Sequence, residues 1–359
     1  MTYQVAVLGA GIGVQHISGL LQLTNRFRVR TVCDLNKELA EVQANRTGGN
    51  FSTSISEVLC DPAIDIVDIC LPPRLHVPIA MDALAAGKHV VVEKPLAGSV
   101  ADADRLCEAE RKAEEKIFPV FQYRYGRAFR QLQALKDAGL LGAPRVASLE
   151  THWNRKADYY AKPWRGTLAH ELGGAVLSHA IHIHDLISTQ FGRAANVSAL
   201  LNTSINAIET EDCAAIAMRM ETGALVTSSV TLGAADDTSR LKMVFQHATA
   251  ESKQVPYAPG EANWIFTARD ADRQNEIDNV VRATSQCREG FTGYFEAIAD
   301  HLDGKPSPVV PLSDGLAAIE LATAIYLADR TGERVVLPLD RSLPICRGWS
   351  DLPHSAGSS

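Results

Sequence analysis

Short apolar runs alternate with helix-like segments through the first third of the chain. The runs share a β-rich composition and lie at Gln4–Leu8, Phe27–Cys33, Ile64–Leu71, His89–Val92 and Ile117–Phe121. Strands of this kind are usually buried on both faces, as in a parallel sheet covered by helices. Between them, Gly87 lies where a helix should stop and Ser99 has the position of a helix N-cap. The alternation predicts an α/β fold over residues 1–122, a doubly wound parallel sheet of the Rossmann type.

A different pattern follows residue 123. Two β-rich runs, Ala214–Met220 and Ala224–Leu232, surround a Glu-Thr-Gly turn and predict a hairpin. The remaining elements that we expect are two strands and two helices, at Val197–Asn202, Met243–Ala248, 289–303 and 313–330. They predict a second, α+β domain over residues 123–340. A tail at 341–359 follows, and its end is rich in Pro, Gly and Ser, which predicts little fixed structure.

The composition indicates which class of protein this sequence belongs to. The 359 residues are 46% hydrophobic and 21% charged, which suits a globular chain of roughly two domains. The formal net charge of −7 argues against nucleic acid or an anionic membrane surface as a partner. The seven cysteines are scattered and form no CxxC pair, which is typical of reduced thiols. No signal-peptide pattern and no membrane-spanning apolar run is present, so we expect a cytoplasmic protein.

The first apolar run ends in a glycine-rich loop. Glycines between a strand and a helix allow a tight turn and the close approach of a dinucleotide pyrophosphate to the helix N-terminus. Gly9 and Gly11 fit the GxGxxG pattern, but Gly13 comes one residue early and Val14 stands in the usual place of the third glycine. An ordinary glycine turn is therefore the alternative to a dinucleotide-binding loop, which would also include Ile12.

Asp34 ends the second predicted strand, 25 residues after Gly9. A carboxylate at this place can accept hydrogen bonds from the adenosine ribose hydroxyls. It would repel a 2′-phosphate, so NAD is favoured over NADP, although the nearby Lys37 softens that preference. A solvated turn aspartate is the alternative.

Residues 72–95, PPRLHVPIAMDALAAGKHVVVEKP, carry a more specific pattern. Together with FQYRYGRAFRQLQALKDAGLLG (121–142), GGAVLSHAIHIHDL (173–186) and two stretches near the C-terminus, they resemble the Gfo/Idh/MocA family of oxidoreductases. The resemblance implies an NAD(P)-binding Rossmann domain and a C-terminal α+β domain with an open, mostly antiparallel sheet. It also implies a sugar, polyol or sugar-derived substrate between the domains, and a homodimer or homotetramer that pairs through the open sheet. We find no landmark of the family between about residue 233 and residue 285.

The resemblance assigns roles to residues that follow the predicted strands. Besides the glycine loop and Asp34, it places at the cofactor Leu71, Pro72, His76, Glu93, Lys94 and Gln122. Lys94 hydrogen-bonds the reacting oxygen, where its charge favours the alkoxide that develops as hydride leaves. His182 is the catalytic base, because imidazole titrates near neutral pH. The structural alternatives are a surface Glu-Lys pair, a helix-capping His76 and a His182 bonded to backbone.

Substrate contacts are expected in the second domain, at Tyr123, Arg124, Trp164, Arg165, Ser178, His179 and His182. The stretch HWNRKADYYAKPWRG (152–166) is rich in aromatic and basic residues. Aromatic faces stack on sugar rings, and arginine or lysine binds hydroxyls and carboxylates, so the stretch hints at a sugar acid. A solvated interdomain loop is the alternative.

Residues 173–185, GGAVLSHAIHIHD, place three histidines on a helix predicted over 176–187. At about 100° per residue, Ser178, His182 and Asp185 share one face, whereas His179 and His184 point elsewhere. The histidines therefore cannot converge on one metal ion, and no metal site is expected. The family most often has an aspartate where this chain has Ser178, so either His179 or another group supplies a partner, or the substrate is handled differently.

These patterns predict an NAD-dependent dehydrogenase that oxidises a secondary hydroxyl of a sugar, inositol or other polyol, or sugar acid. One alternative is a redox-assisted glycosidase or eliminase that keeps NAD bound. Another is a non-catalytic nucleotide-sensing regulator, which the presence of both Lys94 and His182 disfavours.

Overall fold

The computed structural model describes residues 2–162, 164–284 and 286–349, so most of the predicted tail lies outside the described residues. It contains two compact units. One comprises residues 1–122 and 288–316, and the other comprises residues 123–287 and 317–359. The segment 288–316 thus joins the first unit, although the sequence pattern placed it within the second domain. Among the described residues, no helix combines the length and the apolar character needed to cross a membrane.

The first unit is built on a six-stranded parallel sheet in the order β3-β2-β1-β4-β5-β6. Its strands are β1 (Tyr3–Leu8), β2 (Phe27–Cys33), β3 (Asn50–Ser52), β4 (Ile66–Ile69), β5 (His89–Val92) and β6 (Ile117–Pro119). Its helices are α1 (Gly13–Leu20), α2 (Lys37–Thr47), α3 (Ile55–Cys60), α4 (His76–Ala85), α5 (Val100–Lys112) and α11 (Gly290–Leu302). The strand order reverses between β1 and β4, which is the topology of a doubly wound sheet. The predicted α/β fold is confirmed.

Local signals in the first unit act as the sequence predicts. The Ser99 hydroxyl accepts the amide hydrogen of Asp102 at 3.1 Å and caps α5. Gly87 has a φ of 70° just after α4, where a left-handed residue ends a helix. Strand β3 was not predicted, because it lies at the sheet edge and two of its three residues are exposed, so no apolar run marks it.

Helix α11 belongs to the first unit because it packs closely on α1. A Cβ atom on Gly19 would lie 2.9 Å from the Cβ of Phe291, so only glycine allows the two helices this approach. Tyr294 is fully buried, and its hydroxyl donates to the carbonyl of Phe118 in β6 at 3.0 Å. These contacts explain why a segment distant in sequence completes the Rossmann core.

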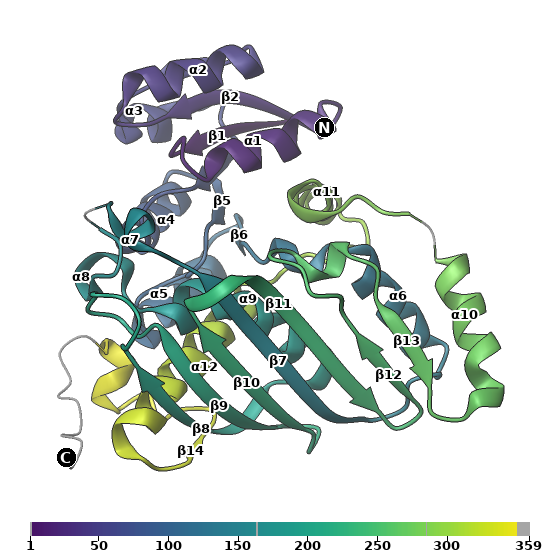
Figure 1. Ribbon diagram of the computed structural model, residues 1–359. Helices are drawn as coiled ribbons and strands as arrows, with labels where there is room; N and C mark the ends of the chain where they lie inside the picture. The colour runs from purple at the N-terminus through teal and green to yellow at the C-terminus, as the bar shows by residue number, and fades with distance from the viewer. Residues whose placement is uncertain (1, 163, 285, 350–359) are drawn as a thin grey trace. The chain divides into compact units, whose positions relative to one another are not determined.

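The second unit contains an eight-stranded sheet in the order β13-β12-β11-β7-β10-β9-β8-β14 (Figure 1). Its strands are β7 (Pro144–Asn154), β8 (Ala194–Asn202), β9 (Cys213–Met220), β10 (Leu225–Thr231), β11 (Gly233–Phe245), β12 (Ala248–Glu251), β13 (Ile265–Ala268) and β14 (Val335–Val336). Within the described residues, β7 and β10 are the one parallel pair of this sheet, so it is mostly antiparallel, as the resemblance implied. The helices are α6 (Arg127–Asp137), α7 (Ala157–Tyr160), α8 (Leu168–Glu171), α9 (Ile181–Phe191), α10 (Gln274–Ala283) and α12 (Leu312–Thr331).

The hairpin predicted around Glu-Thr-Gly is confirmed as β9 and β10. The strand predicted at Met243–Ala248 is wrong in its bounds. Strand β11 already begins at Gly233 and ends at Phe245, and β12 starts at Ala248 after a two-residue turn. The turn consists of Gln246 and His247, and neither is a glycine, proline, asparagine or aspartate, so the sequence carries no turn signal there.

One face of this sheet is covered by helices and the other is more exposed. Phe191 of α9 packs on Phe245 of β11 with ring centroids 5.3 Å apart, and His184 of α9 bonds Ser228 of β10 at 2.9 Å. Strand register places on the opposite face a row of exposed apolar side chains, namely Val146, Leu200, Leu225, Ile265 and Val336.

Glu211 holds the start of the segment that carries the three clustered histidines. It is 8% exposed, and its carboxyl accepts the amide hydrogens of Gly174 (2.9 Å) and Val176 (3.0 Å) and the hydroxyl of Tyr326 (3.0 Å). Burial raises the pKa of Glu211 from 4.5 to about 7, although these hydrogen bonds act in the other direction. The carboxyl therefore titrates near neutral pH inside the fold.

We expect Glu211 to make the stability of the chain depend on pH. Because its pKa in the folded chain exceeds that in the unfolded chain, its contribution is complete below pH 4.5 and is lost as the pH rises through about 7. Relative to Glu211→Gln, the native chain should lose on the order of 3 kcal/mol of unfolding free energy over this interval. Urea titrations of both proteins at several pH values measure it. Glu221→Gln, at an exposed turn, is the control, and a pH-independent difference for Glu211→Gln contradicts the expectation.

Candidate functional site

The glycine loop joins β1 to α1 at the point where the strand order of the parallel sheet reverses. Gly9 has a φ of 99°, and a Cβ atom there would lie 2.4 Å from the carbonyl oxygen of Cys70. Only glycine fits this turn. A Cβ on Gly11 would meet nothing within 4 Å, so the backbone of the loop is open on that side. Ile12 beside it is 39% exposed.

Gly13 has the packing role of the third glycine despite its early position. A Cβ atom there would lie 3.0 Å from a methyl group of Val7 and 3.5 Å from the Cβ of Cys70. Close contact between the first helix and the strands is what the third glycine of a dinucleotide-binding loop provides. The loop is thus one residue shorter than GxGxxG but keeps a turn glycine, an open glycine and a packing glycine. These features fit a dinucleotide pyrophosphate at the N-terminus of α1.

Asp34 lies at the carboxyl end of β2 and is tied to the glycine loop. One carboxylate oxygen accepts the amide hydrogen of Ala10 at 2.7 Å, and the other accepts that of Asn36 at 2.8 Å. The carboxylate is partly exposed, as recognition of a ribose hydroxyl requires. The ammonium group of Lys37 lies 5.5 Å from the ring centroid of Phe51 in the edge strand β3, which is a cation–π contact.

The loop after β4 lies beside the glycine loop. A methyl group of Leu71 is 3.3 Å from the Cβ position of Gly9, and Pro72 follows it. His76 is 1% exposed, and its two ring nitrogens lie 2.7 Å from the carbonyl oxygen of Pro95 and 2.8 Å from that of Leu71. His76 therefore joins two loops through backbone contacts, which is closer to the structural alternative than to a direct cofactor contact.

Glu93 and Lys94 follow β5, the neighbour of β4. One carboxylate oxygen of Glu93 lies 3.0 Å from the Nε2 atom of His16, and the other accepts the amide hydrogen of Lys94 at 3.0 Å. Lys94 thus lies at the carboxyl end of the sheet, where open α/β sheets bind ligands. Gln122 begins a 3₁₀ turn after β6, and its side-chain oxygen is buried without a hydrogen-bond partner among the described residues.

His16, Asp68 and Cys70 form a fully buried cluster behind the glycine loop. The Nδ1 atom of His16 lies 2.9 Å from a carboxylate oxygen of Asp68 and 3.4 Å from the sulfur of Cys70. In the described part of the chain, these three side chains are also a group close enough to share a metal ion. Their mutual hydrogen bonds satisfy them without an ion, so we treat them as a hydrogen-bonded cluster.

In the second unit, Tyr123 and Arg124 meet the helix that carries the histidines. The ring of His182 stacks on Tyr123 with centroids 4.3 Å apart and an interplanar angle of 22°. Arg124 donates to Asp185 through Nε at 2.7 Å and through a second nitrogen, and the Asp185 side chain is 3% exposed. Asp185 therefore anchors the helix through Arg124, and the Arg124 guanidinium already has a carboxylate partner.

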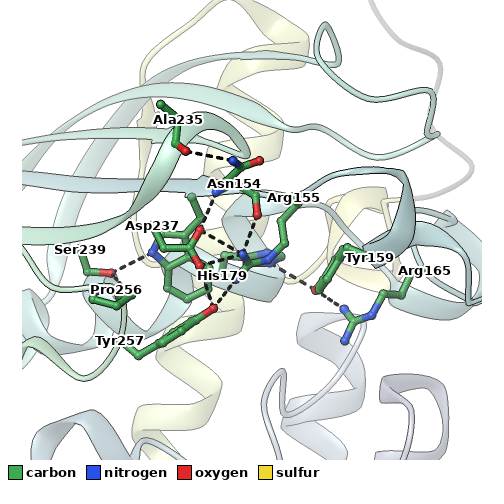
Figure 2. Close-up of polar contacts among 11 residues, drawn as sticks. Asn154, Arg155, Tyr159, Arg165, His179, Ala235, Asp237, Ser239, Pro256 and Tyr257 are labelled. Carbon is green, nitrogen blue, oxygen red and sulfur yellow. Dashed lines mark hydrogen bonds and ion pairs between the residues drawn. The ribbon is translucent and has the colours of Figure 1, made fainter.

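Ser178 contacts its own helix and His179. Its hydroxyl donates to the carbonyl of Gly174 at 2.7 Å, so its oxygen is left to accept from Nδ1 of His179, also at 2.7 Å. The Nε2 atom of His179 then accepts from the hydroxyl of Tyr159 at 3.3 Å, and Arg165 donates to that same hydroxyl (Figure 2). This chain of hydrogen bonds makes His179 the partner of Ser178.

Arg165 joins the chain to Glu171 and Trp164. Its guanidinium pairs with Glu171 at 3.1 Å and lies 4.0 Å from the ring centroid of Tyr159 and 4.3 Å from that of Trp164. Stacking over two rings together with a carboxylate partner orients this arginine firmly.

A second arginine group lies beside the first (Figure 2). Arg155 pairs with Asp237 at 3.0 Å and donates to the hydroxyl of Tyr257 at 3.0 Å, and Tyr257 donates to Asp237 at 2.9 Å. The guanidinium of Arg155 also lies 4.8 Å from the ring centroid of Trp153. The group joins the end of β7 to a segment in which the sequence shows no family landmark.

The helix predicted over 176–187 differs at its start. Residues Val176–Ala180 form a π-helical turn, and α9 begins only at Ile181. The wider turn changes the angular offset of Ser178 from His182, whereas His182 and Asp185 both lie within α9 and keep α-helical spacing. The three histidines instead contact different groups, with His184 bonded to Ser228.

Five of the residues described in the two units were not singled out from the sequence, namely His16, Asp68, Glu211, Asp237 and Tyr257. Trp153 and Tyr159 lie within the stretch 152–166, whose aromatic residues were expected to contact a sugar. For Asp68 a signal exists, since a carboxylate inside the apolar run IVDI must have a buried partner. For Asp237 and Tyr257 no local signal exists, because their partner Arg155 is 82 and 102 residues away.

Known proteins with related sequences and structures agree with this fold. The NAD-binding Rossmann-fold model of the Gfo/Idh/MocA oxidoreductase family matches residues 3–121, and a Gfo/Idh/MocA C-terminal domain model matches residues 129–251. An uncharacterised oxidoreductase from Synechocystis sp. is 29% identical over 211 residues, which cover 56% of this chain and 54% of that protein. A myo-inositol 2-dehydrogenase from Thermotoga maritima is 26% identical over 229 residues, covering 62% of this chain and 66% of that protein.

A solved structure gives a longer match. The WlbA dehydrogenase from Bordetella pertussis, in complex with NADH and UDP-GlcNAcA, superposes with a TM-score of 0.83 at 27% identity and covers 94% of this chain and 98% of its own. The chain therefore belongs to the Gfo/Idh/MocA family of oxidoreductases, and its first unit contains an NAD-binding Rossmann domain.

Proposed function

We propose that the protein is an NAD-dependent dehydrogenase that oxidises a secondary hydroxyl group of a sugar, inositol or related polyol. The observation that carries the proposal is the joint position of the glycine loop and Lys94, which follow β1 and β5 at the carboxyl end of one parallel sheet. Ligands of open α/β sheets bind at this end. The relatives named above include a myo-inositol dehydrogenase, which supports the same substrate class.

The residues of the first unit divide the binding of NAD among them. The backbone of Gly11 and Ile12 holds the pyrophosphate at the N-terminus of α1, and Asp34 accepts the ribose hydroxyls. The bound cofactor supplies a hydride acceptor. Lys94 donates a hydrogen bond to the substrate oxygen, and its positive charge stabilises the negative charge that develops there.

His182 takes the proton of the reacting hydroxyl. The stacked Tyr123 ring restrains the plane of the imidazole, and the Arg124–Asp185 pair holds the next turn of the helix. Restraint of a base in one orientation lowers the entropy that the reaction must lose. The His179 ring, bonded at both nitrogens to Ser178 and Tyr159, positions the preceding turn instead of acting as a base.

The substrate is proposed to be rich in hydroxyl groups and uncharged. Each of the arginines of the second unit that were expected to bind a sugar acid has a carboxylate partner within the chain. The pairs are Arg124 with Asp185, Arg155 with Asp237, and Arg165 with Glu171. A substrate carboxylate would compete with these partners, whereas a hydroxyl can accept from a paired guanidinium or donate to its carboxylate.

The proposal predicts NAD reduction with a neutral polyol. Purified protein is incubated with NAD+ and, in turn, myo-inositol, D-glucose, D-xylose and D-glucuronate, and NADH is followed at its absorbance band. We expect a neutral member of this panel to be oxidised faster than D-glucuronate. Lys94→Ala and His182→Ala should each lower kcat by about 100-fold or more while NADH binding, measured by fluorescence, is retained.

Two results would contradict this proposal in different ways. Absence of NADH binding removes the cofactor assignment. Cleavage of a glycoside without net formation of NADH replaces the dehydrogenase with a redox-assisted glycosidase.

Asp34 should set the preference for NAD. Asp34→Asn removes the negative charge that a 2′-phosphate would meet, so the ratio of kcat/KM with NAD to that with NADP should fall by about tenfold or more. Lys37→Ala is the matched control and should change the ratio less than about threefold, because the Lys37 ammonium lies over Phe51. An unchanged ratio in Asp34→Asn would show that another group selects the cofactor.

We also propose that the protein forms a homodimer or homotetramer through the exposed face of the second unit's sheet. Leu200, at 71% exposure, and Leu225, at 46%, lie on that face. Leu200→Glu should shift the molar mass measured by light scattering toward that of a monomer, since a charge in an apolar interface has no partner. Val42→Glu, 56% exposed on α2 of the first unit, should leave the mass unchanged. A monomeric native chain would contradict the proposal.

A further inference from the structure

We propose that His16 is a positioning residue for the reaction: a buried imidazolium that braces Glu93 and thereby fixes the Lys94 backbone. The inference rests on the proposed role of Lys94. It concerns a residue three positions beyond Gly13, within the first helix, that touches neither the open side of the glycine loop nor solvent.

Two carboxylates face opposite sides of the His16 ring. Asp68 of β4 lies 2.9 Å from Nδ1, and Glu93 at the end of β5 lies 3.0 Å from Nε2. A neutral imidazole has one N–H group and would present a lone pair to one of these carboxylates. The imidazolium form donates to both, so both contacts are satisfied with His16 protonated.

The surroundings of His16 fit this charge state. The ring is 0% exposed, with Cys70 as the third polar neighbour and the rings of Phe291 and Phe295 from α11 at centroid distances of 4.2 and 5.8 Å. Burial lowers the pKa of His16. The nearby Asp68 and the contact with Cys70 raise this pKa by more than burial lowers it, so the pKa lies well above 6.5. Burial also raises the pKa of the Cys70 thiol, so Cys70 adds no charge near neutral pH.

Glu93 connects His16 to the backbone of Lys94. Its first carboxylate oxygen contacts His16, and its second accepts the amide hydrogen of Lys94 at 3.0 Å. At the start of α4, Nδ1 of His76 contacts the carbonyl oxygen of Pro95 at 2.7 Å. The Glu93–Pro95 turn is therefore held from α1 on one side and from α4 on the other. A carboxylate bound at both oxygens has few orientations, which restricts the backbone that carries Lys94.

The contact between His16 and Glu93 also links the glycine loop to the Glu93–Pro95 turn. His16 is on α1, whose N-terminus is the glycine loop, and close packing at Gly13 sets the distance of α1 from β1 and Cys70. A change of side chain at His16 is therefore expected to disturb Lys94 while the glycine loop, held by its own glycines, still binds NADH.

The charge state of His16 can be measured without a substrate and in the unmodified protein. Protein labelled with 15N-histidine is studied by NMR at about pH 8, where an unperturbed imidazole is neutral. We expect His16 to have both ring nitrogens protonated at this pH, and its signals are identified by their loss in His16→Gln. A neutral His16 with a single N–H proton would overturn the proposal.

The positioning role is tested by kinetics with the panel compound that is oxidised fastest. His16→Gln should lower kcat about 10- to 100-fold while KM and the dissociation constant of NADH change less than about threefold. In a Glu93→Gln background the same change should cost less than about threefold more, because the brace then has no carboxylate to hold. His89→Gln, at the opposite end of β5, is the matched control and should retain the native kcat.

The outcomes separate this proposal from the proposed function. Equal losses of kcat from His16→Gln in the native and Glu93→Gln backgrounds would assign His16 a general structural role and overturn the brace. Failure of every panel compound would contradict the proposed function, and the NMR measurement would still decide the charge state. A fall in NADH affinity equal to the fall in kcat would place the effect of His16 on the glycine loop and overturn the proposal.

Discussion

Buried carboxylates determine where the elements of the candidate site meet. A carboxylate removed from water must be paired with a charge or bonded by several donors, or it becomes neutral. Asp68 and Glu93 share His16, Asp185 has Arg124, and Glu211 has two backbone amides and Tyr326. Each group joins segments far apart in the sequence. Within each unit, the positions of the candidate site residues follow from these partnerships more than from local helix or strand preferences.

The same constraint explains which parts of the structure could be predicted from the sequence. Five of the six strands of the parallel sheet could be predicted, because each of the five is an apolar run, and Gly9, Gly87 and Ser99 mark where neighbouring elements begin or end. Lys94 and Asp34 could be placed because both follow such strands. His16 could not, since helical spacing cannot show that its partners lie 52 and 77 residues further along the chain. Edge strands such as β3, which bury little, leave no apolar pattern to read.

The glycine loop departs from the spacing of the GxGxxG pattern but keeps the contacts that the pattern provides. Spacing alone suggests that Val14 has replaced a required glycine. The packing shows that Gly13 makes the close approach to Val7 and Cys70, so the loop is shortened by one residue and no glycine function is lost. What a dinucleotide loop requires is a set of contacts: a turn, an open backbone and a close helix. The spacing of glycines in the sequence indicates these contacts only indirectly.

Ser178 was the residue that the sequence left unexplained, and its neighbours now account for it. An aspartate at this position would bring a carboxylate next to Nδ1 of His179 and to the carbonyl of Gly174, which the serine hydroxyl contacts at 2.7 Å. A carboxylate cannot donate to that carbonyl, and it would repel its oxygen. The serine instead donates to the carbonyl and accepts from His179, and the direction of the hydrogen bonds continues through Tyr159 to Arg165. Because the chain ends at a cation already paired with Glu171, it adds no net charge. The position at which the family pattern most often has an aspartate is therefore occupied in this protein by a neutral hydroxyl, whose donor and acceptor are both satisfied within the chain.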